Sequence, residues 1–543
     1  MMKKGIINTA IFSALVLSLS GCQASNIGTE AAAMPTSSGE VNEIGGTEDA
    51  EETDTEKEKE VMENSADGEH VITADGEKAE YSNIKIIKTG EAEGDEADFY
   101  GSNSAIYATN GGTLTLSNMD IETDGTHANA VFSYGEGTTV NISDSVISTK
   151  GNCSGGLMTT GGGTMNAENL EIHTTGNSSA AIRSDRGGGT VKVTGGDYTT
   201  DGKGSPVIYS TADITVSDAH LTSNASQGVV VEGKNSVTLN NDEVIALNNT
   251  KNSNKSEYYQ AVMIYQSMSG DADEGIASFA MNGGSLINKN GDVFFVNNTM
   301  AEISLKEADI VNEDESGIFL RAAAAGWGNE GSNGGHVDMI TEKQSVDGDM
   351  LVDDISSLNL YLKDGSSYTG AINPEGKAGN VYVELSGGSK WILEGDSNIS
   401  SLSCDADSID LNGHKLYVNG EEYAEGTASS GEAITVETAD NGHAGKPGDG
   451  NPPDGNKPDG DKPNGNKADG DKPDGGKMDG GKTDGEQDNG EKNDGEKPDA
   501  PPSDGKGGRG GTPPDGKMGE KPDGMRDGNP PEKPGNKQSA QEV

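Results

Sequence analysis

Residues 104–117 read SAIYATNGGTLTLS, and this stretch decides the fold because closely similar units follow it. One reads AVFSYGEGTTVNIS at residues 130–143, and the next reads GLMTTGGGTMNAE at residues 156–168. In each copy a short apolar strand leads through a Gly-rich turn into a second strand, in which apolar and polar residues alternate. Self-similarity of this kind indicates a repeat architecture before any single motif is considered.

The period of the repeat is nearly constant. The second strands begin their apolar positions 26, 25, 26, 23 and 23 residues apart, at Leu114, Val140, Met165, Val191, Ile214 and Val237. Each segment is too short and too rich in Gly, Thr, Ser and Asn for a helix. A β-sandwich would also alternate, but it would not repeat in register. The period therefore predicts an all-β fold, a right-handed parallel β-helix with about 23–26 residues in each coil.

The first residues have the pattern of an export signal. Lys3 and Lys4 precede an apolar run over residues 6–19, and the run ends in Leu-Ser-Gly-Cys at residues 19–22. This resembles the lipobox of bacterial lipoproteins, which implies cleavage before Cys22 and a diacylglycerol on its thiol. We therefore expect a signal peptide at residues 1–21 and a lipid-anchored protein on the surface of a bacterial membrane.

Composition divides the rest of the chain. Residues 22–78 are acidic and poor in aromatic side chains, which is typical of a disordered linker. The solenoid is expected over residues 79–440. Residues 441–543 repeat KPDGD-like units and predict a disordered tail. The net charge of −52 excludes a nucleic-acid partner, and we expect a monomer.

Two cysteines remain once Cys22 is set aside. Cys153 and Cys404 lie many coils apart, which is too far for a disulfide at about 4.8 Å per coil. Neither has an evident His partner in the sequence. The sequence therefore predicts that both thiols are structural.

The outward side chains of the first strands suggest a binding surface. Strand alternation places an apolar and aromatic row there, with polar side chains beside it, and a ladder of this kind suits the faces and hydroxyl groups of sugar rings. The linker or a loop could instead cover it. The predicted ligand-binding residues are Tyr107, Phe132, Tyr134, Met158, Arg183, Asp185, Met263, Tyr265, Phe295, Phe319, Arg321 and Trp327.

Three longer connections interrupt the repeat, at residues 248–259, 267–276 and 322–335. Binding residues often lie on such insertions. Trp327 in the last one is a candidate platform for stacking a sugar ring, or an anchor for its own loop. An acidic group in the second insertion could offer oxygen ligands to calcium, or could be a solvated loop. Its members are Asp271, Asp273 and Glu274.

Catalysis is the less favoured interpretation. A polysaccharide lyase needs a base and a cation, and the one suggestive group is Arg183, Asp185 and Arg186. The coil architecture resembles that of pectate lyases, but their Trp-x-Asp-His and Arg-x-Pro-x-x-Arg signatures are absent.

A closer resemblance is to surface β-helix proteins of anaerobic bacteria, including members that bind cellulose, or pectin with calcium. It rests on the GGT-apolar-x-apolar coils and on LNGHKLYVNG at residues 411–420, and it covers about residues 79–437. The resemblance implies non-catalytic binding of a polysaccharide. An adhesin that docks a surface protein, a polysaccharide lyase and a structural spacer remain the alternatives.

Overall fold

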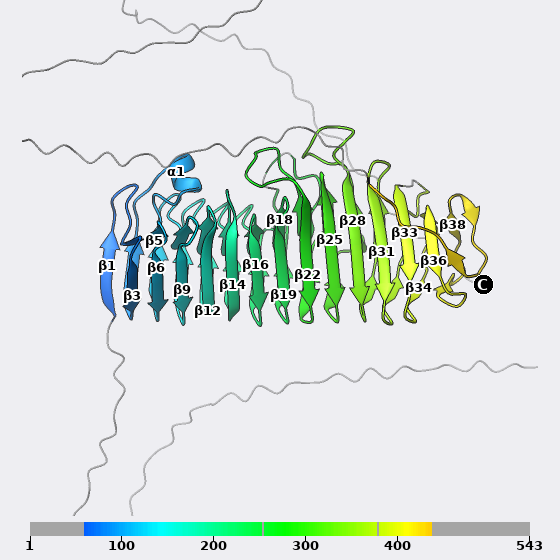
Figure 1. Cartoon of the computed structure of the whole chain (residues 1–543), viewed down its shortest axis with the longest axis horizontal. Coiled ribbons are helices and arrows are strands. Elements are labelled where there is room, and N and C mark those ends of the chain that lie inside the picture. The colour runs from blue at the N-terminus through cyan, green and yellow to red at the C-terminus, as the bar shows by residue number, and fades with distance from the viewer. Residues whose placement is uncertain (1–58, 252, 254, 377–378, 437–543) are drawn as a thin grey trace, which may run out of the picture. The chain divides into compact units, whose positions relative to one another are not determined.

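The regular secondary structure in the described part of the chain is almost entirely β-strand (Figure 1). A computed structural model describes residues 59–251, 253, 255–376 and 379–436. Within these residues the one helix is α1, a single turn at Asp95–Asp98. No helix in this part is long and apolar enough to cross a membrane. The predicted leader, Cys22, most of the acidic linker and the tail lie outside the described residues.

The first strands of the coils pair in parallel, and they form a stack of eleven strands (the first-strand stack). Ile106 pairs with Val131, and Val131 pairs with Leu157, so neighbours in the stack lie one predicted period apart. The members are β2 (Ile72–Asp75), β5 (Ile106–Thr109), β8 (Val131–Tyr134), β11 (Leu157–Thr160), β13 (Ile182–Ser184), β15 (Ile208–Ser210), β18 (Val229–Glu232), β21 (Gln260–Tyr265), β24 (Asp292–Asn297), β27 (Ile318–Ala322) and β30 (Asp349–Val352).

The second strands form a longer parallel stack (the second-strand stack). A short strand, β40 (Ser429–Ser430), pairs antiparallel with its last member. The members are β3 (Lys78–Ser82), β6 (Thr113–Ser117), β9 (Thr139–Ser143), β12 (Gly163–Thr174), β14 (Gly189–Thr200), β16 (Asp213–Ser217), β19 (Ser236–Asn240), β22 (Ile276–Asn282), β25 (Thr299–Lys306), β28 (Gly335–Glu342), β31 (Ser357–Lys363), β33 (Asn380–Leu385) and β36 (Ser401–Cys404).

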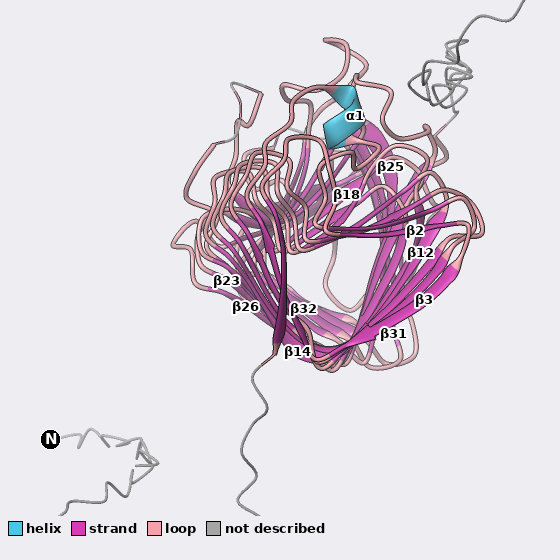
Figure 2. Ribbon diagram, turned by 90° about the vertical axis from the view of Figure 1, so that its left-hand side faces the viewer, coloured by secondary structure: helices cyan, strands magenta, loops and turns pink. Residues whose placement is uncertain are grey.

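The third strands complete each coil, and Figure 2 shows the three sides in a view along the stack. β12 and β14 are long enough to supply both a second and a third strand. The other third strands are β1 (Glu60–Asn64), β4 (Ile84–Lys88), β7 (Asp120–Thr123), β10 (Val146–Thr149), β17 (His220–Ser223), β20 (Glu243–Ala246), β23 (Ser285–Asn288), β26 (Asp309–Asn312), β29 (Ser345–Asp347), β32 (Ser367–Thr369), β34 (Lys390–Ile392) and β37 (Ile409–Asp410). At the C-terminal end β35 (Ser397–Ile399), β38 (Leu416–Val418) and the antiparallel β39 (Glu421–Glu422) form a small sheet.

The corner between the second and third strands uses one backbone conformation repeatedly. Its residue has a positive φ of 51° at Asn118, 47° at Asp144 and 53° at Asn169. Asn, Asp and Gly tolerate this left-handed region best, because a short polar side chain can bond locally and Gly has no Cβ. The sequence supplies one of these types at most of the equivalent corners, and this choice lets each coil turn within a residue.

Apolar side chains fill most of the interior of the coils, as the alternating pattern predicts. Residues such as Leu114, Val140 and Met165 from the second strands are fully buried and belong to one continuous core cluster. Serines close another corner. The Ser179 hydroxyl accepts a hydrogen bond from the Ser154 amide, and the Ser205 hydroxyl accepts one from the Ser179 amide, at 2.9 Å each. Side chains thus bind successive coils together where the strands end.

Two details differ from the expectations. Strands begin before Ala79, because β1 and β2 already pair with later coils inside the range assigned to the linker. Phe319 does not face outward: an irregularity between Ile318 and Leu320 shifts the alternation, and the Phe319 side chain lies in the core cluster with its ring 5.5 Å from that of Phe294. The parallel stacks themselves are confirmed.

Candidate functional site

The predicted row on the first-strand stack forms, but two of its positions are held by residues other than those that strict alternation predicts. Tyr107 pairs with Phe132, Phe132 with Met158, and Met158 with Arg183. The next member is Tyr209, which pairs with Arg183. Strict alternation along this strand would place Ile208 in the row, but Ile208 points inward into the core cluster. Farther along, Arg321 is the partner of Phe295, in the place that had been given to Phe319.

This row is covered, so the expectation of an exposed aromatic ladder is wrong. Phe132 and Met158 are fully buried, and Phe295 is 1% exposed. Met263 and Tyr265 are also buried, whereas Tyr107 and Tyr134 keep part of their surface. The longer connections cover the row, and Figure 1 shows α1 and these loops projecting on the same side of the stack.

The segment around α1 covers the N-terminal part of the row. The backbone of Gly101 lies directly on the Phe132 ring, where an added Cβ would come within 2.7 Å of it. Gly101 also has a φ of 75°, so a side chain there would be disfavoured twice. The Thr160 hydroxyl donates a 2.8 Å hydrogen bond to the Phe99 carbonyl. These contacts fix the segment on strands β8 and β11.

Loop aromatics cover the C-terminal part. A second apolar cluster forms outside the core from Val230, Met263, Tyr265, Phe295 and Ala323, with Tyr209, Tyr258, Ala325 and Trp327 packed against it. The Trp327 ring lies 5.2 Å from that of Tyr265, and the Tyr258 ring lies 5.3 Å from that of Phe295. Of the two interpretations of Trp327, the loop anchor fits these contacts.

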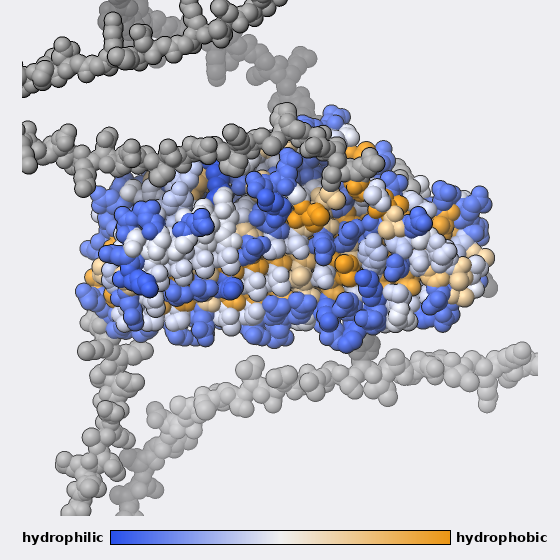
Figure 3. Space-filling view, in the orientation of Figure 1, coloured by the Kyte–Doolittle hydropathy of each residue, from blue (hydrophilic) through white to orange (hydrophobic). Residues whose placement is uncertain are grey.

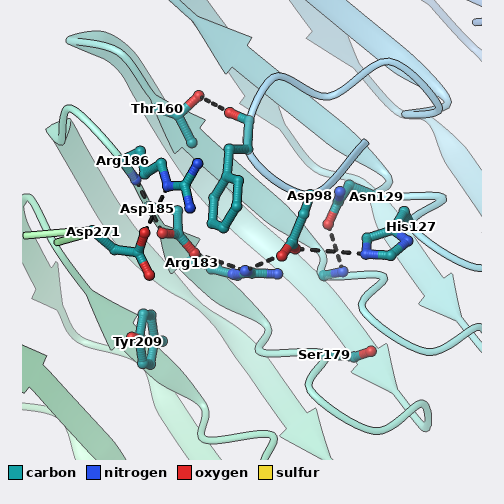
Figure 4. A network of polar contacts seen from close by, with 12 residues as sticks. Asp98, His127, Asn129, Thr160, Ser179, Arg183, Asp185, Arg186, Tyr209 and Asp271 are labelled. Carbon is teal, nitrogen blue, oxygen red and sulfur yellow. Dashed lines mark hydrogen bonds and ion pairs between the residues drawn. The ribbon is translucent and has the colours of Figure 1, made fainter. Parts of the chain in front are cut away.

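Arg183, Asp185 and Arg186, the group considered for catalysis, lie within an ionic network (Figure 4). Arg183 Nη2 lies 2.7 Å from Asp185 Oδ2 and 3.2 Å from Asp98 Oδ1 of α1. Asp185 is 4% exposed, and burial raises its pKa to about 6 although Arg183 acts in the opposite direction. The network therefore joins a strand to the segment that covers it.

Arg186 makes the second half of this network. Its Nε lies 2.6 Å from Asp271 Oδ1 in one insertion, and its Nη1 lies 3.0 Å from Asp95 Oδ2 in α1. The guanidinium also stacks 3.5 Å above the Phe99 ring. Two neighbouring arginines thus hold three separate parts of the chain together.

The proposed calcium ligands are used otherwise. Asp271 pairs with Arg186, and Asp273 pairs with Lys234 at 2.8 Å. Glu274 is exposed. Across the described residues no group of three or more His, Cys, Asp or Glu side chains is arranged to hold a metal ion.

A buried carboxylate, that of Glu232, lies beside the ionic network. Glu232 is 1% exposed, and its Oε2 accepts hydrogen bonds from the hydroxyl groups of Tyr209 and Tyr265, the second at 2.9 Å. Burial holds the pKa of both tyrosines well above the usual range. Both hydroxyl groups therefore stay protonated and act as donors, which helps to bury Glu232 without a cation of its own.

The open surface lies on another side, over the second strands. A depression of about 410 Å³ crosses β6, β9, β12 and β14. Its lining residues are Thr115, Leu116, Ser117, Asn141, Ile142, Ser143, Asn166, Ala167, Glu168, Lys192 and Thr194. Figure 3 shows the molecule in the orientation in which Figure 1 labels these strands, and pale and blue residues predominate there.

Strand pairing orders the outward side chains of these four strands into three rows (together, the second-strand face). The first row is Thr113, Thr139, Thr164 and Thr190; the second is Thr115, Asn141, Asn166 and Lys192; the third is Ser117, Ser143, Glu168 and Thr194. Only Glu168 and Lys192 among them carry a charge. In a chain with a net charge of −52, this is a strongly polar but nearly neutral surface.

The sequence contained the signal for this face. The polar residues that alternate with Leu114 and Leu116, and with their equivalents, are the ones that the pleat turns outward. These hydroxyl and amide side chains are not among the predicted ligand-binding residues, because aromatic residues are the stronger sequence signal for stacking sugar rings. Comparison of the chain with protein-family models, with curated proteins and with solved structures found no match.

Proposed function

We propose that this chain is a lipid-anchored bacterial surface protein that binds an extended, uncharged polysaccharide without cleaving it, along the second-strand face. The coils wind as a right-handed parallel β-helix in this proposal, since nearly all crossovers between parallel strands of one sheet have that hand. The Leu-Ser-Gly-Cys pattern that ends at Cys22 supports the lipid anchor.

The observation that carries the proposal is the repetition of hydroxyl and amide groups on an open, nearly uncharged face. The side chains within each row follow one another at about 4.8 Å along the stack, so a polymer that lies across the strands meets similar groups at each step. Asn166 Nδ2 donates a 2.9 Å hydrogen bond to Asn141 Oδ1, which holds neighbouring amides in a line. Hydroxyl-rich ligands exchange their bonds to water for bonds of this kind.

The state of the arginines supports binding rather than cleavage. A lyase would need a cation and a base turned toward the polymer. Arg183 and Arg186 instead contact carboxylates of the covering segments, and Asp185 is buried beneath them. The remaining charges of the second-strand face, Glu168 and Lys192, lie in different rows on neighbouring strands.

A pull-down assay tests this proposal. The full mature chain carrying Cys22→Ser, which avoids the lipid, is mixed with insoluble neutral and acidic polysaccharides, with and without calcium. Depletion by a neutral polymer without new ultraviolet absorbance from unsaturated sugar ends is the expected result. The double variant Asn141→Ala/Asn166→Ala should bind about tenfold more weakly, since each lost hydrogen bond is worth about 0.5–1.5 kcal/mol.

A matched double variant on the third strands, Thr199→Ala/Thr222→Ala, should bind as the unchanged chain does. Equal loss in both variants would remove the second-strand face from consideration. Absorbance that rises with time would show a lyase. Binding that disappears when the target surface is treated with protease would show an adhesin for protein instead.

A further inference from the structure

An asparagine side chain on the second-strand stack already binds amide groups in this structure. Asn359 lies on the outward side of β31, where its Nδ2 donates to the Ile434 carbonyl oxygen at 3.0 Å and its Oδ1 accepts from the Ile434 amide at 2.8 Å. The Ser401 hydroxyl holds the same segment by donating to the Glu432 carbonyl oxygen at 2.8 Å. A backbone segment thus crosses this end of the stack, and one asparagine binds both its N–H and its C=O groups.

Two asparagines of the same stack have amide groups that remain available. Asn141 and Asn166 are half-buried and line the depression over β9 and β12. Asn166 Nδ2 donates to Asn141 Oδ1 at 2.9 Å. A side-chain amide has an acceptor oxygen and a nitrogen with two donor hydrogens. Within the part of the chain that the structure describes, no hydrogen bond uses Asn141 Nδ2 or Asn166 Oδ1. The pair therefore offers one donor group and one acceptor to a ligand.

The groups around this pair differ from those around Asn359. Asn359 is followed in its row by Tyr382, whose hydroxyl donates to Glu384 Oε2 at 2.9 Å. Asn141 and Asn166 instead lie between the threonine row and the row that contains Ser143. A ligand that carries hydroxyl groups on both sides of an amide suits these surroundings, whereas a peptide backbone carries no hydroxyl groups beside its amides. The setting therefore favours a sugar that bears an amide.

We propose that the polymer bound by the second-strand face is built from N-acetylated amino sugars, an inference that rests on the proposed function and names its ligand class. The carbonyl oxygen of an acetamido group accepts from Asn141 Nδ2, and the N–H of an acetamido group donates to Asn166 Oδ1. The ring hydroxyl groups exchange their bonds to water for bonds to the neighbouring threonine and serine side chains. Such a polymer is uncharged, which matches a face whose only charges are Glu168 and Lys192.

Chitin and cellulose are the matched ligands for a test, because chitin carries an acetamido group where cellulose carries a hydroxyl group. Neither polymer is charged, so the net charge of −52 favours neither. The full mature chain carrying Cys22→Ser is titrated onto suspensions of each. Binding to chitin should be about tenfold tighter, because the amide contacts are made with chitin alone. A soluble oligomer of N-acetylglucosamine should displace the bound chain at about a tenth of the concentration that a glucose oligomer of equal length requires.

Substitution of the pair shows whether these asparagines cause the preference. In Asn141→Ala/Asn166→Ala the two polymers should bind about equally. Asn240→Ala/Asn282→Ala is the matched control, since Asn282 Nδ2 donates to Asn240 Oδ1 at 3.0 Å in a similar pair on β19 and β22. Asn240 Nδ2 is already bonded to the Ser217 hydroxyl at 3.3 Å, so this control should keep the preference for chitin. Far-ultraviolet circular dichroism of each variant shows whether the fold is kept.

The possible results separate this inference from the proposed function. Equal binding of the unchanged chain to chitin and cellulose would overturn the inference and leave the proposed function in place. Binding to neither polymer would remove both. A preference for chitin that persists in Asn141→Ala/Asn166→Ala would overturn the assignment to this pair. Displacement by an uncharged, sugar-free peptide as efficiently as by the N-acetylglucosamine oligomer would show a peptide site instead, and would also overturn it.

Discussion

Folding buries two carboxyl groups in surroundings that disfavour their ionised form. Asp185 is 4% exposed and Asp242 is fully buried, and burial raises the pKa of each to about 6. Asp242 lies between β19 and β20, where its two oxygens accept hydrogen bonds from the Ala219 and Asn240 amides, both at 2.8 Å. The folded state of both groups therefore holds a proton more firmly than the unfolded state does.

This sets the direction of a pH effect. Between about pH 4 and pH 6 the folded chain binds more protons at Asp185 and Asp242 than the unfolded chain, so their contribution to the free energy of unfolding falls as the pH rises. A pKa raised by about two units corresponds to a loss of about 3 kcal/mol for each group. Urea unfolding measured from pH 4.5 to pH 7.5 gives the change in the free energy of unfolding with pH.

The contribution of Asp242 to this pH dependence is isolated by comparing Asp242→Asn with the unchanged chain. Burial lowers the pKa of His70 and His336, and these groups act in the opposite direction as the pH rises. The difference between the two chains removes that background. A difference that stays constant with pH would contradict the assignment of a raised pKa to Asp242.

Phe295 shows how the role of a residue changes once the covering loops are known. Its ring lies under Tyr258 and is 1% exposed, so Phe295→Ala should lower the free energy of unfolding by about 3–5 kcal/mol. Val146→Ala is the control, because Val146 is 44% exposed and should change the value by less than about 0.5 kcal/mol. If Phe295→Ala and Val146→Ala lowered the free energy of unfolding by the same small amount, in both thermal and urea unfolding, the row would be open to solvent.

At the scale of elements, the strands could be predicted from the sequence, but the segments that cover the first-strand row could not. Alternation shows which side chains share a face, and the spacing of Leu114, Val140 and Met165 gave the order in which strands stack. Alternation cannot show what lies above a face, because Phe132 meets Gly101 only after the segment around α1 folds back. The shift at Phe319 was equally hidden, since one irregular residue reverses the sides of a strand.

A substitution at Arg186 tests whether the segments that cover the first-strand row, α1 and the insertion at residues 267–276, are held in place together. Arg186 lies in the turn after β13, and it joins this turn to α1 and to the insertion that contains Asp271. Arg186→Ala should speed amide hydrogen exchange at both residues 95–98 and 267–276, because both segments lose their shared partner. Lys234→Ala breaks an exposed ion pair of the same insertion, with Asp273, and should leave exchange nearly unchanged. Faster exchange in only one of the two segments would contradict a shared clamp.

At the scale of the molecule, each coil contacts mainly its neighbours, so a coil should be removable in phase. Asp144 and Asn169 are equivalent corner residues, and a chain without residues 144–168 joins Ser143 directly to Asn169. We expect this chain to keep its β-type circular dichroism and to unfold cooperatively at a lower temperature. Removal of residues 144–155 is the control, since it places a first strand where a third strand belongs and should abolish cooperative unfolding.

The uniform rows of the second-strand face have one further consequence. Threonine follows threonine in the first row, and serine or asparagine recurs in the other two, so one rung resembles the next. A polymer lying across the strands would have no single preferred position and could shift by a rung at little energetic cost. If the proposed binding is right, many equivalent placements would favour long polymers statistically, and they would allow a bound polymer to slide along the surface without first dissociating.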